Sequence, residues 1–184
     1  MRGCQLTAQS STSKPKWSKI VLRLSNLETL QMSNITLRDA TIQDWAFVAA
    51  LTETCMRGYC EQTWGEWRPD DRDSFDAGMH QVIRLGGEDI GCLALIDDAS
   101  FLNLKSLYIL PPYQRRGIGT TLMQQIINGA EAQRKPVQLR VLRVNPARRF
   151  YERHGFLVTH STSERHFMTR PVDTRPPTTG MWAV

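Results

Sequence analysis

The stretch 107–120 has the residue types of an anion-binding turn. It reads Leu-Tyr-Ile-Leu-Pro-Pro-Tyr-Gln-Arg-Arg-Gly-Ile-Gly-Thr, which predicts a strand that passes through a proline-bounded turn directly into a helix. The first N–H groups of a helix have no partner within it, and the helix dipole adds partial positive charge, so main chain alone can bind phosphate oxygens there. Gly117 and Gly119 bring no side chain that would hold a phosphate away, and Thr120 adds a hydroxyl donor.

This stretch differs from two common nucleotide-binding motifs. The third glycine of a dinucleotide-binding fingerprint is missing, and no Gly-Lys-Ser/Thr triplet of a P-loop is present. A purely structural role stays open, because both glycines could serve only tight packing of a helix on a sheet. In that case Arg115 and Arg116 would form a solvated basic face.

A second motif follows further along the chain. It runs from Asn145 to Phe156 and reads Asn-Pro-Ala-Arg-Arg-Phe-Tyr-Glu-Arg-His-Gly-Phe. The segment Gln114–Gly119 matches the Gln/Arg-x-x-Gly-x-Gly/Ala signature of the GNAT acetyltransferases, and the second motif matches that family's Asn-x-Ala and Phe-Tyr-Glu-x-x-Gly-Phe element. Over about Ile35 to Arg170 the chain therefore resembles the GNAT superfamily of N-acetyltransferases.

The resemblance implies acetyl-CoA as co-substrate and assigns residues to it. Its pantetheine arm would lie along the strand before the loop, at Leu107, Tyr108 and Ile109, and its pyrophosphate would lie on the loop. The complete set of cofactor-binding residues that we expect is Leu107, Tyr108, Ile109, Gln114, Arg115, Arg116, Gly117, Ile118, Gly119, Thr120, Asn145 and Arg148.

Tyr151 matches the family position beside the sulfur of the cofactor. An unperturbed phenol has a pKa near 10, so at neutral pH it stays protonated and can donate a proton to a departing thiolate. The resemblance thus implies that Tyr151 is the general acid. Without the motif, an aromatic residue that packs under the helix beside Phe150 is the simpler interpretation.

The acceptor side is less defined by the sequence. Glu61 is the leading candidate for the base that deprotonates the amine, with Glu53, Tyr108 and His80 as alternatives. Tyr59 and Trp64 are expected to bind the acceptor. The segment 59–67 could form an aromatic, acidic pocket for a cationic amine, or equally a hydrophobic plug over the core.

Strands and helices alternate around these motifs, which predicts an α+β (α/β/α) fold. The resemblance implies a mixed, mostly antiparallel twisted sheet of about seven strands with a splayed parallel pair and helices on both faces. A slip in the alternation between Leu104 and Leu107 indicates a β-bulge. The expected strands are 35–38, 80–85, 89–96, 101–110, 137–144, 156–160 and 165–169, and the expected helices are 41–57, 71–78, 117–134 and 146–154.

The composition indicates the domain organisation, the cellular location and the state of the cysteines. Residues 1–33 are expected to be an N-terminal extension, 34–170 the acetyltransferase domain and 171–184 a tail. No apolar run approaches the roughly 20 residues that span a bilayer, and no signal peptide is evident, so a cytoplasmic protein is expected. The four cysteines lack metal-ligand spacing and are interpreted as free thiols, with no metal site.

The net charge of +5 favours an anionic partner, which a phosphorylated cofactor would satisfy. Nucleic acid is a less favoured partner, because the arginines gather at the two motifs. The acceptor could be a small amine or a peptide or protein amine, and a homodimer is possible. Two alternatives stay open: a catalytically silent CoA-binding module, and an enzyme that acts on an aminoacyl-tRNA amine.

Overall fold

The computed structural model describes residues 34–172 of the 184-residue chain. The expectations for the N-terminal extension lie outside the described residues. So does all of the expected tail except its first two residues.

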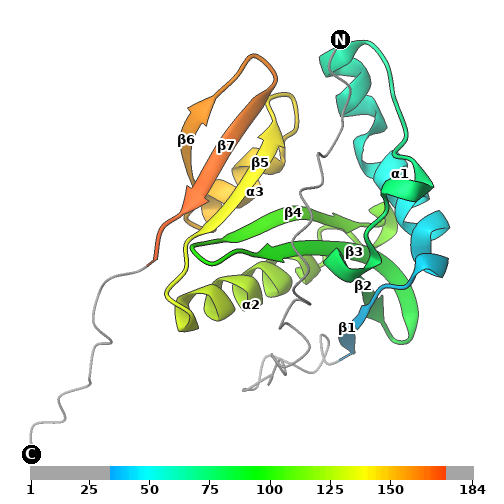
Figure 1. The fold of residues 1–184 in the computed structure, drawn as a ribbon, viewed down its shortest axis with the longest axis horizontal. Helices are drawn as coiled ribbons and strands as arrows, with labels where there is room; N and C mark the ends of the chain where they lie inside the picture. Colours follow the sequence, from blue (N-terminus) through cyan, green and yellow to red (C-terminus); the bar gives the residue numbers. More distant parts are fainter. Residues whose placement is uncertain (1–33, 173–184) are drawn as a thin grey trace, which may run out of the picture.

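A seven-stranded sheet forms the centre of the molecule (Figure 1), with the strand order β1-β2-β3-β4-β5-β7-β6. Neighbouring strands are antiparallel except β4 and β5, which are parallel. The strands are β1 (Ile35–Asp39), β2 (His80–Leu85), β3 (Glu88–Asp97), β4 (Leu102–Ile109), β5 (Val137–Leu142), β6 (Leu157–Ser161) and β7 (Arg165–Arg170). This is the mixed, mostly antiparallel sheet expected from the sequence.

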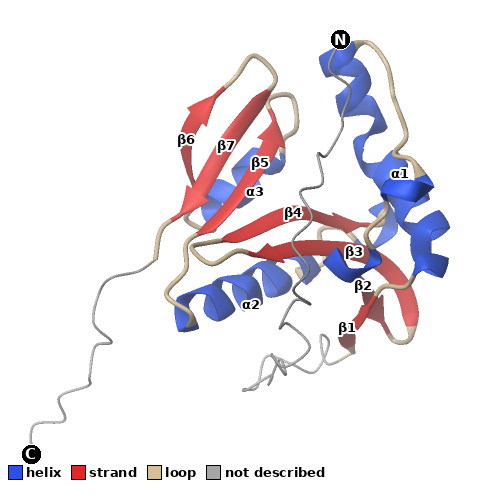
Figure 2. Ribbon diagram, viewed as in Figure 1, coloured by secondary structure: helices blue, strands red, loops and turns tan. Residues whose placement is uncertain are grey.

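The helices lie on both faces of this sheet (Figure 2). They are α1 (Trp45–Trp64), α2 (Ile118–Ala132) and α3 (Ala147–Arg153), with short 3-10 turns at Ile42–Asp44, Arg72–Ser74, Ala77–Met79 and Pro111–Tyr113. No described helix is long and apolar enough to cross a membrane.

Two apolar clusters show which helix covers which face. The larger one joins α2 and α3 to the sheet and includes Leu104, Met123 and Phe156. The smaller one joins α1 to the other face through Leu51 and Cys92. Since side chains alternate along a strand, β4 contributes Leu107 to the first cluster and Tyr108 to the second.

The first helix is longer than the sequence predicted. It was expected to end near Arg57, but α1 continues to Trp64 and ends at Gly65, whose φ of 81° is left-handed and whose N–H bonds to the Glu61 carbonyl. Glycine is the usual residue in that conformation at the end of a helix. Gly58 does not end the helix; it lies inside α1, at a position with open space around it.

The start of this region was predicted correctly. Asp44 accepts hydrogen bonds from the main-chain N–H and the hydroxyl of Thr41, at 2.7 and 3.0 Å. The same carboxylate pairs with Arg38, and Arg38 in turn pairs with Asp89 on β3, each at 2.7 Å. These contacts tie the entry of α1 to the first strands of the sheet.

Candidate active site

The site begins where the two parallel strands separate. The pairing of β4 with β5 covers three residue pairs and ends at Leu104 opposite Leu139. Beyond that point β4 stays paired with β3 as far as Ile109, and β5 stays paired with β7. The splayed parallel pair expected from the sequence is therefore present, and we call this point of divergence the fork.

A β-bulge lies directly at the fork. Ala94 of β3 pairs with Ser106 and Leu95 pairs with Leu104, so Lys105 is the extra residue on β4. The slip in alternation predicted this bulge correctly. A bulge bends its strand and increases the local twist, which here accompanies the departure of β4 from β5.

The loop after β4 exposes consecutive main-chain N–H groups. Arg115 and Gly117 have left-handed φ angles of 58° and 82°, whereas Arg116 between them does not. This alternation makes successive N–H groups converge into a concave nest that suits an anion. Gln114 fixes the preceding turn, because its side-chain nitrogen donates to the Ile109 carbonyl at 2.8 Å.

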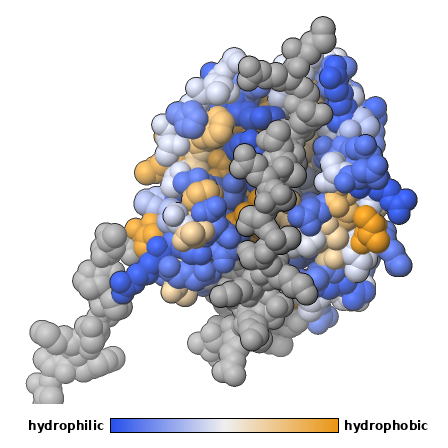
Figure 3. Space-filling view, in the orientation of Figure 1, coloured by the Kyte–Doolittle hydropathy of each residue, from blue (hydrophilic) through white to orange (hydrophobic). Residues whose placement is uncertain are grey.

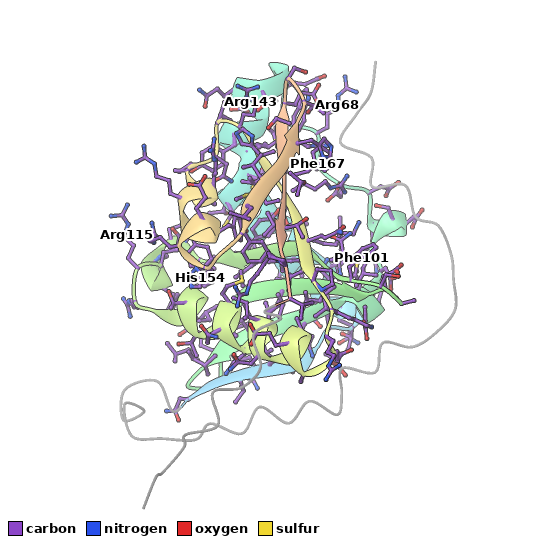
Figure 4. The ribbon with its side chains drawn as sticks, turned by 90° about the vertical axis from the view of Figure 1, so that its left-hand side faces the viewer. Arg68, Phe101, Arg115, Arg143, His154 and Phe167 are labelled. Carbon is purple, nitrogen blue, oxygen red and sulfur yellow. The ribbon has the colours of Figure 1, made fainter. Side chains whose placement is uncertain are left out.

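The helix α2 starts directly after this nest. Thr121 makes the first backbone bond of the helix, to the Gly117 carbonyl at 3.0 Å. The N–H groups of Ile118, Gly119 and Thr120 therefore have no partner one turn earlier in the helix. The expected phosphate-binding residues 114–120 are thus brought together as one continuous N–H-rich surface, and Figure 4 shows the Arg115 side chain projecting outward from it.

Gly119 has a different role from Gly117. A Cβ at Gly119 would lie 3.6 Å from the Phe150 ring and 3.7 Å from the Ile109 side chain, which are ordinary contacts. Its Cα thus faces the apolar core between α2 and α3, where an alanine would also fit. Packing therefore does not require a glycine at position 119, whereas the left-handed conformation accounts for Gly117.

Asn145 connects the second strand of the fork to α1. Its side-chain oxygen accepts from the Ala147 N–H at 2.9 Å, and its amide nitrogen lies 3.8 Å from the Met56 sulfur. The first contact holds the start of α3, and the second reaches across to the helix on the other face of the sheet. Asn145 therefore lies just after the end of β5 and links the start of α3 to α1.

Tyr151 lies in α3 among aromatic rings. Its ring meets Phe150 and Phe156 edge-on, with centroids 5.4 and 5.8 Å apart. Burial raises the pKa of the Tyr151 phenol to about 12. The surroundings thus keep the hydroxyl protonated, and the aromatic packing expected as the simpler interpretation is also present.

Arg148 lies on the exposed side of α3. It pairs with Glu152 at 2.7 Å and lies 3.4 Å from the Nε2 atom of the buried His166. A hollow of about 550 Å³ is lined by Arg143, Val144, Asn145, Pro146, Arg148, Arg149 and Glu152. Asn145 lines this hollow, and none of residues 114–120 does.

The acceptor candidates lie on the last turns of α1. Trp64 packs against Arg165 of β7, whose guanidinium carbon lies 5.1 Å from the ring centroid. Glu61 points outward and pairs with Arg57, which also pairs with Glu53 at 2.7 Å. The segment 59–64 is therefore part of α1, beyond the helix end expected near Arg57, and the exposed Glu61 side chain is paired with Arg57.

Two cationic side chains at the fork were not predicted from the sequence. Lys105 and Arg140 directly follow the last paired residues, Leu104 and Leu139. They lie far apart in the sequence and meet only through the parallel pairing. The register slip at Lys105 was the one signal that could have drawn attention to it.

The surface seen in Figure 3 is a mixture of hydrophilic residues and small hydrophobic patches over the described elements. Four large apolar side chains are notably exposed among residues 34–172: Ile42, Val144, Leu157 and Val158. Val144 lies beside Asn145 and lines the same hollow as Arg148.

A sheet with one splayed parallel pair, followed by an N–H-rich loop and helix, is the fold that the resemblance to the GNAT superfamily implied. The family model described as an acetyltransferase (GNAT) domain matches residues 76–158. This span contains the fork, the loop and Tyr151. Residues 76–158 are therefore similar to a GNAT acetyltransferase domain.

Solved structures share this fold at low sequence identity. PaiA N-acetyltransferase from Thermoplasma acidophilum, in complex with coenzyme A, has a TM-score of 0.60 and 17% identity, over 74% of this chain and 98% of its own. The ribosomal-protein-S18-alanine N-acetyltransferase from Escherichia coli has a TM-score of 0.60 and 16% identity, over 78% and 97%.

A third example is Arabidopsis thaliana Naa50 with a bisubstrate analogue, CoA-Ac-MVNAL, at a TM-score of 0.57 and 16% identity, over 74% and 97%. No curated protein sequence matches the chain. At these identities the solved structures support the fold, and the site must be argued from its own residues.

Proposed function

We propose that this protein is an acetyl-CoA-dependent N-acetyltransferase, which transfers an acetyl group to a primary amine by direct attack within a ternary complex. The observation that carries the proposal is the fork itself. Beyond Leu104, β5 no longer pairs with the edge of β4. This edge leads directly into the N–H-rich loop 114–120. An extended amide-bearing arm and a diphosphate suit these two neighbouring surfaces.

Each surface fits one part of acetyl-CoA by its chemistry. The pantetheine arm has amide groups that can pair with the β4 main chain near Leu107 and Ile109, as an added strand would. The nest at Arg115–Gly117 and the start of α2 offer N–H donors to the pyrophosphate. PaiA N-acetyltransferase in complex with coenzyme A and Naa50 in complex with a CoA-containing analogue share the fold.

The reaction forms a bond from the amine nitrogen to the acetyl carbon and breaks the bond from that carbon to sulfur. The departing thiolate needs a proton, and we assign its donation to the Tyr151 hydroxyl. A phenol whose pKa is raised to about 12 stays protonated at neutral pH. It therefore holds the proton until the thiolate develops beside it.

The base is a separate question. Glu61 was the first candidate, but its exposed side chain pairs with Arg57 on the outer part of α1. Glu53 pairs with the same arginine, and the His80 Nδ1 atom bonds to the Asp76 carbonyl at 2.8 Å. Tyr108 lies on the β4 segment beyond the fork, on the face covered by α1, so we propose it ahead of these three.

Calorimetric titration with acetyl-CoA tests the cofactor site. In Gly117→Asp a carboxylate would stand in the nest and repel the pyrophosphate, so binding should weaken at least about a hundredfold. Gly65→Asp is the matched control, because Gly65 has nearly the same left-handed φ, 81° against 82°, but ends α1. Aspartate tolerates this conformation better than most residues.

Both variants thus place an aspartate in a left-handed backbone conformation, but only Gly117→Asp does so in the proposed pyrophosphate site. Tight binding by the native protein and Gly65→Asp, with loss in Gly117→Asp, is the expected result. Failure of the native protein to bind acetyl-CoA, or equal binding by both variants, would contradict the proposal.

A further inference from the structure

Lys105 and Arg140 occupy equivalent places on the two strands of the fork. Each is the first residue after the last parallel pair, Leu104 with Leu139. Lys105 is also the extra residue of the bulge, so it lies where the backbone turns away from β5. The geometry therefore sets one cation on each side of the opening.

Both side chains belong to the face of the sheet that α1 covers. Leu139 and Val141 pack in the cluster with α2 and α3, so Arg140 between them points to the opposite face. Leu104 and Leu107 also belong to that cluster, and the bulge leaves Lys105 outside it. The charge of Arg140 reaches Lys105, because it contributes, after burial, to lowering the pKa of that lysine.

The other residues on this face add positive charge and aromatic rings. Arg140 pairs across the sheet with Phe167, and the Phe167 ring stacks on His160 with centroids 4.0 Å apart. Arg165, two residues before Phe167, lies against the Trp64 ring. Figure 4 shows Phe167 in the upper part of β7.

The carboxylates of the neighbouring helices are directed away from Lys105. Among residues 34–172, Lys105 makes no ion pair, and the α1 carboxylates Glu53 and Glu61 are directed to Arg57. Glu152 lies on α3, on the other face, where it pairs with Arg148. A cationic acceptor such as a polyamine would meet like charges at the fork, whereas an acceptor with an anionic group would meet opposite ones.

We propose that Lys105 and Arg140 bind the carboxylate of the acceptor, which is a small amine that carries its carboxylate close to the amino group, as an α-amino acid does. The inference rests on the proposed function, because that function sets the reacting thioester at the fork. A planar guanidinium can hold a carboxylate with two parallel hydrogen bonds, and the ammonium of Lys105 adds a third donor group. The pair would orient the amine toward the acetyl carbon.

Release of free thiol from acetyl-CoA measures the acceptor preference directly. One reaction contains an equimolar pool of α-amino acids, and the other contains the matching pool of their decarboxylated amines, such as tyramine for tyrosine. The native enzyme is expected to prefer the amino-acid pool by about tenfold to a hundredfold in kcat/KM, the effect of one or two charge-assisted hydrogen bonds.

Variants at the fork then test the residues. Lys105→Met and Arg140→Gln should each reduce the preference at least about fivefold, through KM for the amino acid, while acetyl-CoA affinity stays unchanged. Arg140→Glu should invert the preference in favour of the amine pool. The matched control is Arg153→Gln, which removes an exposed arginine from α3 and should leave the preference intact.

Three results would count against the carboxylate site. Faster transfer to the decarboxylated pool, or no transfer to either pool by a protein that binds acetyl-CoA, would overturn the carboxylate proposal and direct the search to protein amines. A preference that survives both Lys105→Met and Arg140→Gln would also overturn it. Loss of acetyl-CoA binding by the native protein is the distinct result that rejects the proposed function itself.

Discussion

The side chain of Gln114 donates a hydrogen bond to the carbonyl oxygen of Ile109, with a nitrogen–oxygen distance of 2.8 Å, and so spans the turn between them. The bond joins the last residue of β4 to the start of the loop 114–120. We expect Gln114→Leu to weaken acetyl-CoA binding about fivefold to tenfold, because the loop loses a fixed starting point, and to lower the free energy of unfolding by about 1 kcal/mol. Calorimetry and urea denaturation measure the two effects.

The control for this loop effect is Gln124→Leu. Gln124 lies on α2 and donates to Asn128 at 2.8 Å on the exposed side of the helix. Its loss removes a side-chain hydrogen bond without touching the loop. Equal weakening of acetyl-CoA binding by both variants would show that Gln114 does not shape the loop.

Tyr151→Phe removes only the hydroxyl proposed as the proton donor. We expect kcat to fall about a hundredfold, the usual scale for loss of a general acid, with acetyl-CoA affinity unchanged. Adding Phe150→Tyr to the Tyr151→Phe variant, which places a hydroxyl one residue earlier, should not restore kcat. Pre-steady-state kinetics of acetyl transfer would measure the chemical step. An unchanged rate in Tyr151→Phe would mean that Tyr151 contributes only to packing.

Gly91 sets how closely β3 and β4 approach each other beside the site. A Cβ at Gly91 would lie 2.4 Å from the carbonyl oxygen of Tyr108, a main-chain atom that cannot swing away. Gly91→Ala is expected to destabilise the protein by about 2–3 kcal/mol and to reduce acetyl-CoA binding, because β4 must shift.

Gly58→Ala supplies the opposite case. Gly58 lies within α1 with nothing within 4 Å of an added Cβ, so alanine should stabilise the helix by about 0.5–1 kcal/mol. Thermal unfolding of the two variants should therefore move in opposite directions. Two shifts of the same sign would mean that the approach of Gly91 to Tyr108 does not limit the side chain at position 91.

The Asp44 carboxyl is expected to make the free energy of unfolding decrease at acidic pH. Hydrogen bonds from Arg38 and then from Thr41 hold the pKa of the Asp44 carboxyl well below its usual range. A pKa that is depressed in the folded state contributes stability that is present above the unfolded pKa, near 4, and is lost as pH falls below it.

The native protein should therefore lose stability between about pH 5 and pH 2 more steeply than Asp44→Asn, in which this carboxyl is absent. Urea unfolding at a series of pH values would measure both slopes. Arg38→Met should flatten the slope in the same way, since it removes the partner. Parallel slopes in all three proteins would contradict the assignment.

The fold was largely predictable because its signals are local. The strands 80–85 and 89–96 were expected and form the β2–β3 hairpin, in which Gly86 and Gly87 both have positive φ. The slip after Leu104 predicted the bulge. The end of α1 was not predictable in the same way. Gly58 and Gly65 look alike in the sequence, and only the packing of the helix on the sheet decides which one ends it.

The shape of the loop 114–120 was predictable from the sequence, whereas the arrangement of side chains at the fork was not. The loop 114–120 is continuous in sequence, so its motif and its geometry coincide. Lys105 and Arg140 are brought together by a parallel pairing that no local pattern encodes. Glu61 was favoured because it was expected to lie between the first two helices, whereas α1 continues to Trp64 and Glu61 pairs with Arg57 on its exposed side.

The three residue pairs that join β4 to β5 also have a mechanical meaning. They are the seam between a half-sheet of β1–β4 and a half-sheet of β5–β7, each of which has far longer antiparallel pairings inside it. A molecule lying in the gap beyond Leu104 would touch both halves and act as a non-covalent crosslink between them. Occupancy of the gap should therefore slow amide hydrogen exchange most strongly along this seam, at 102–104 and 137–139.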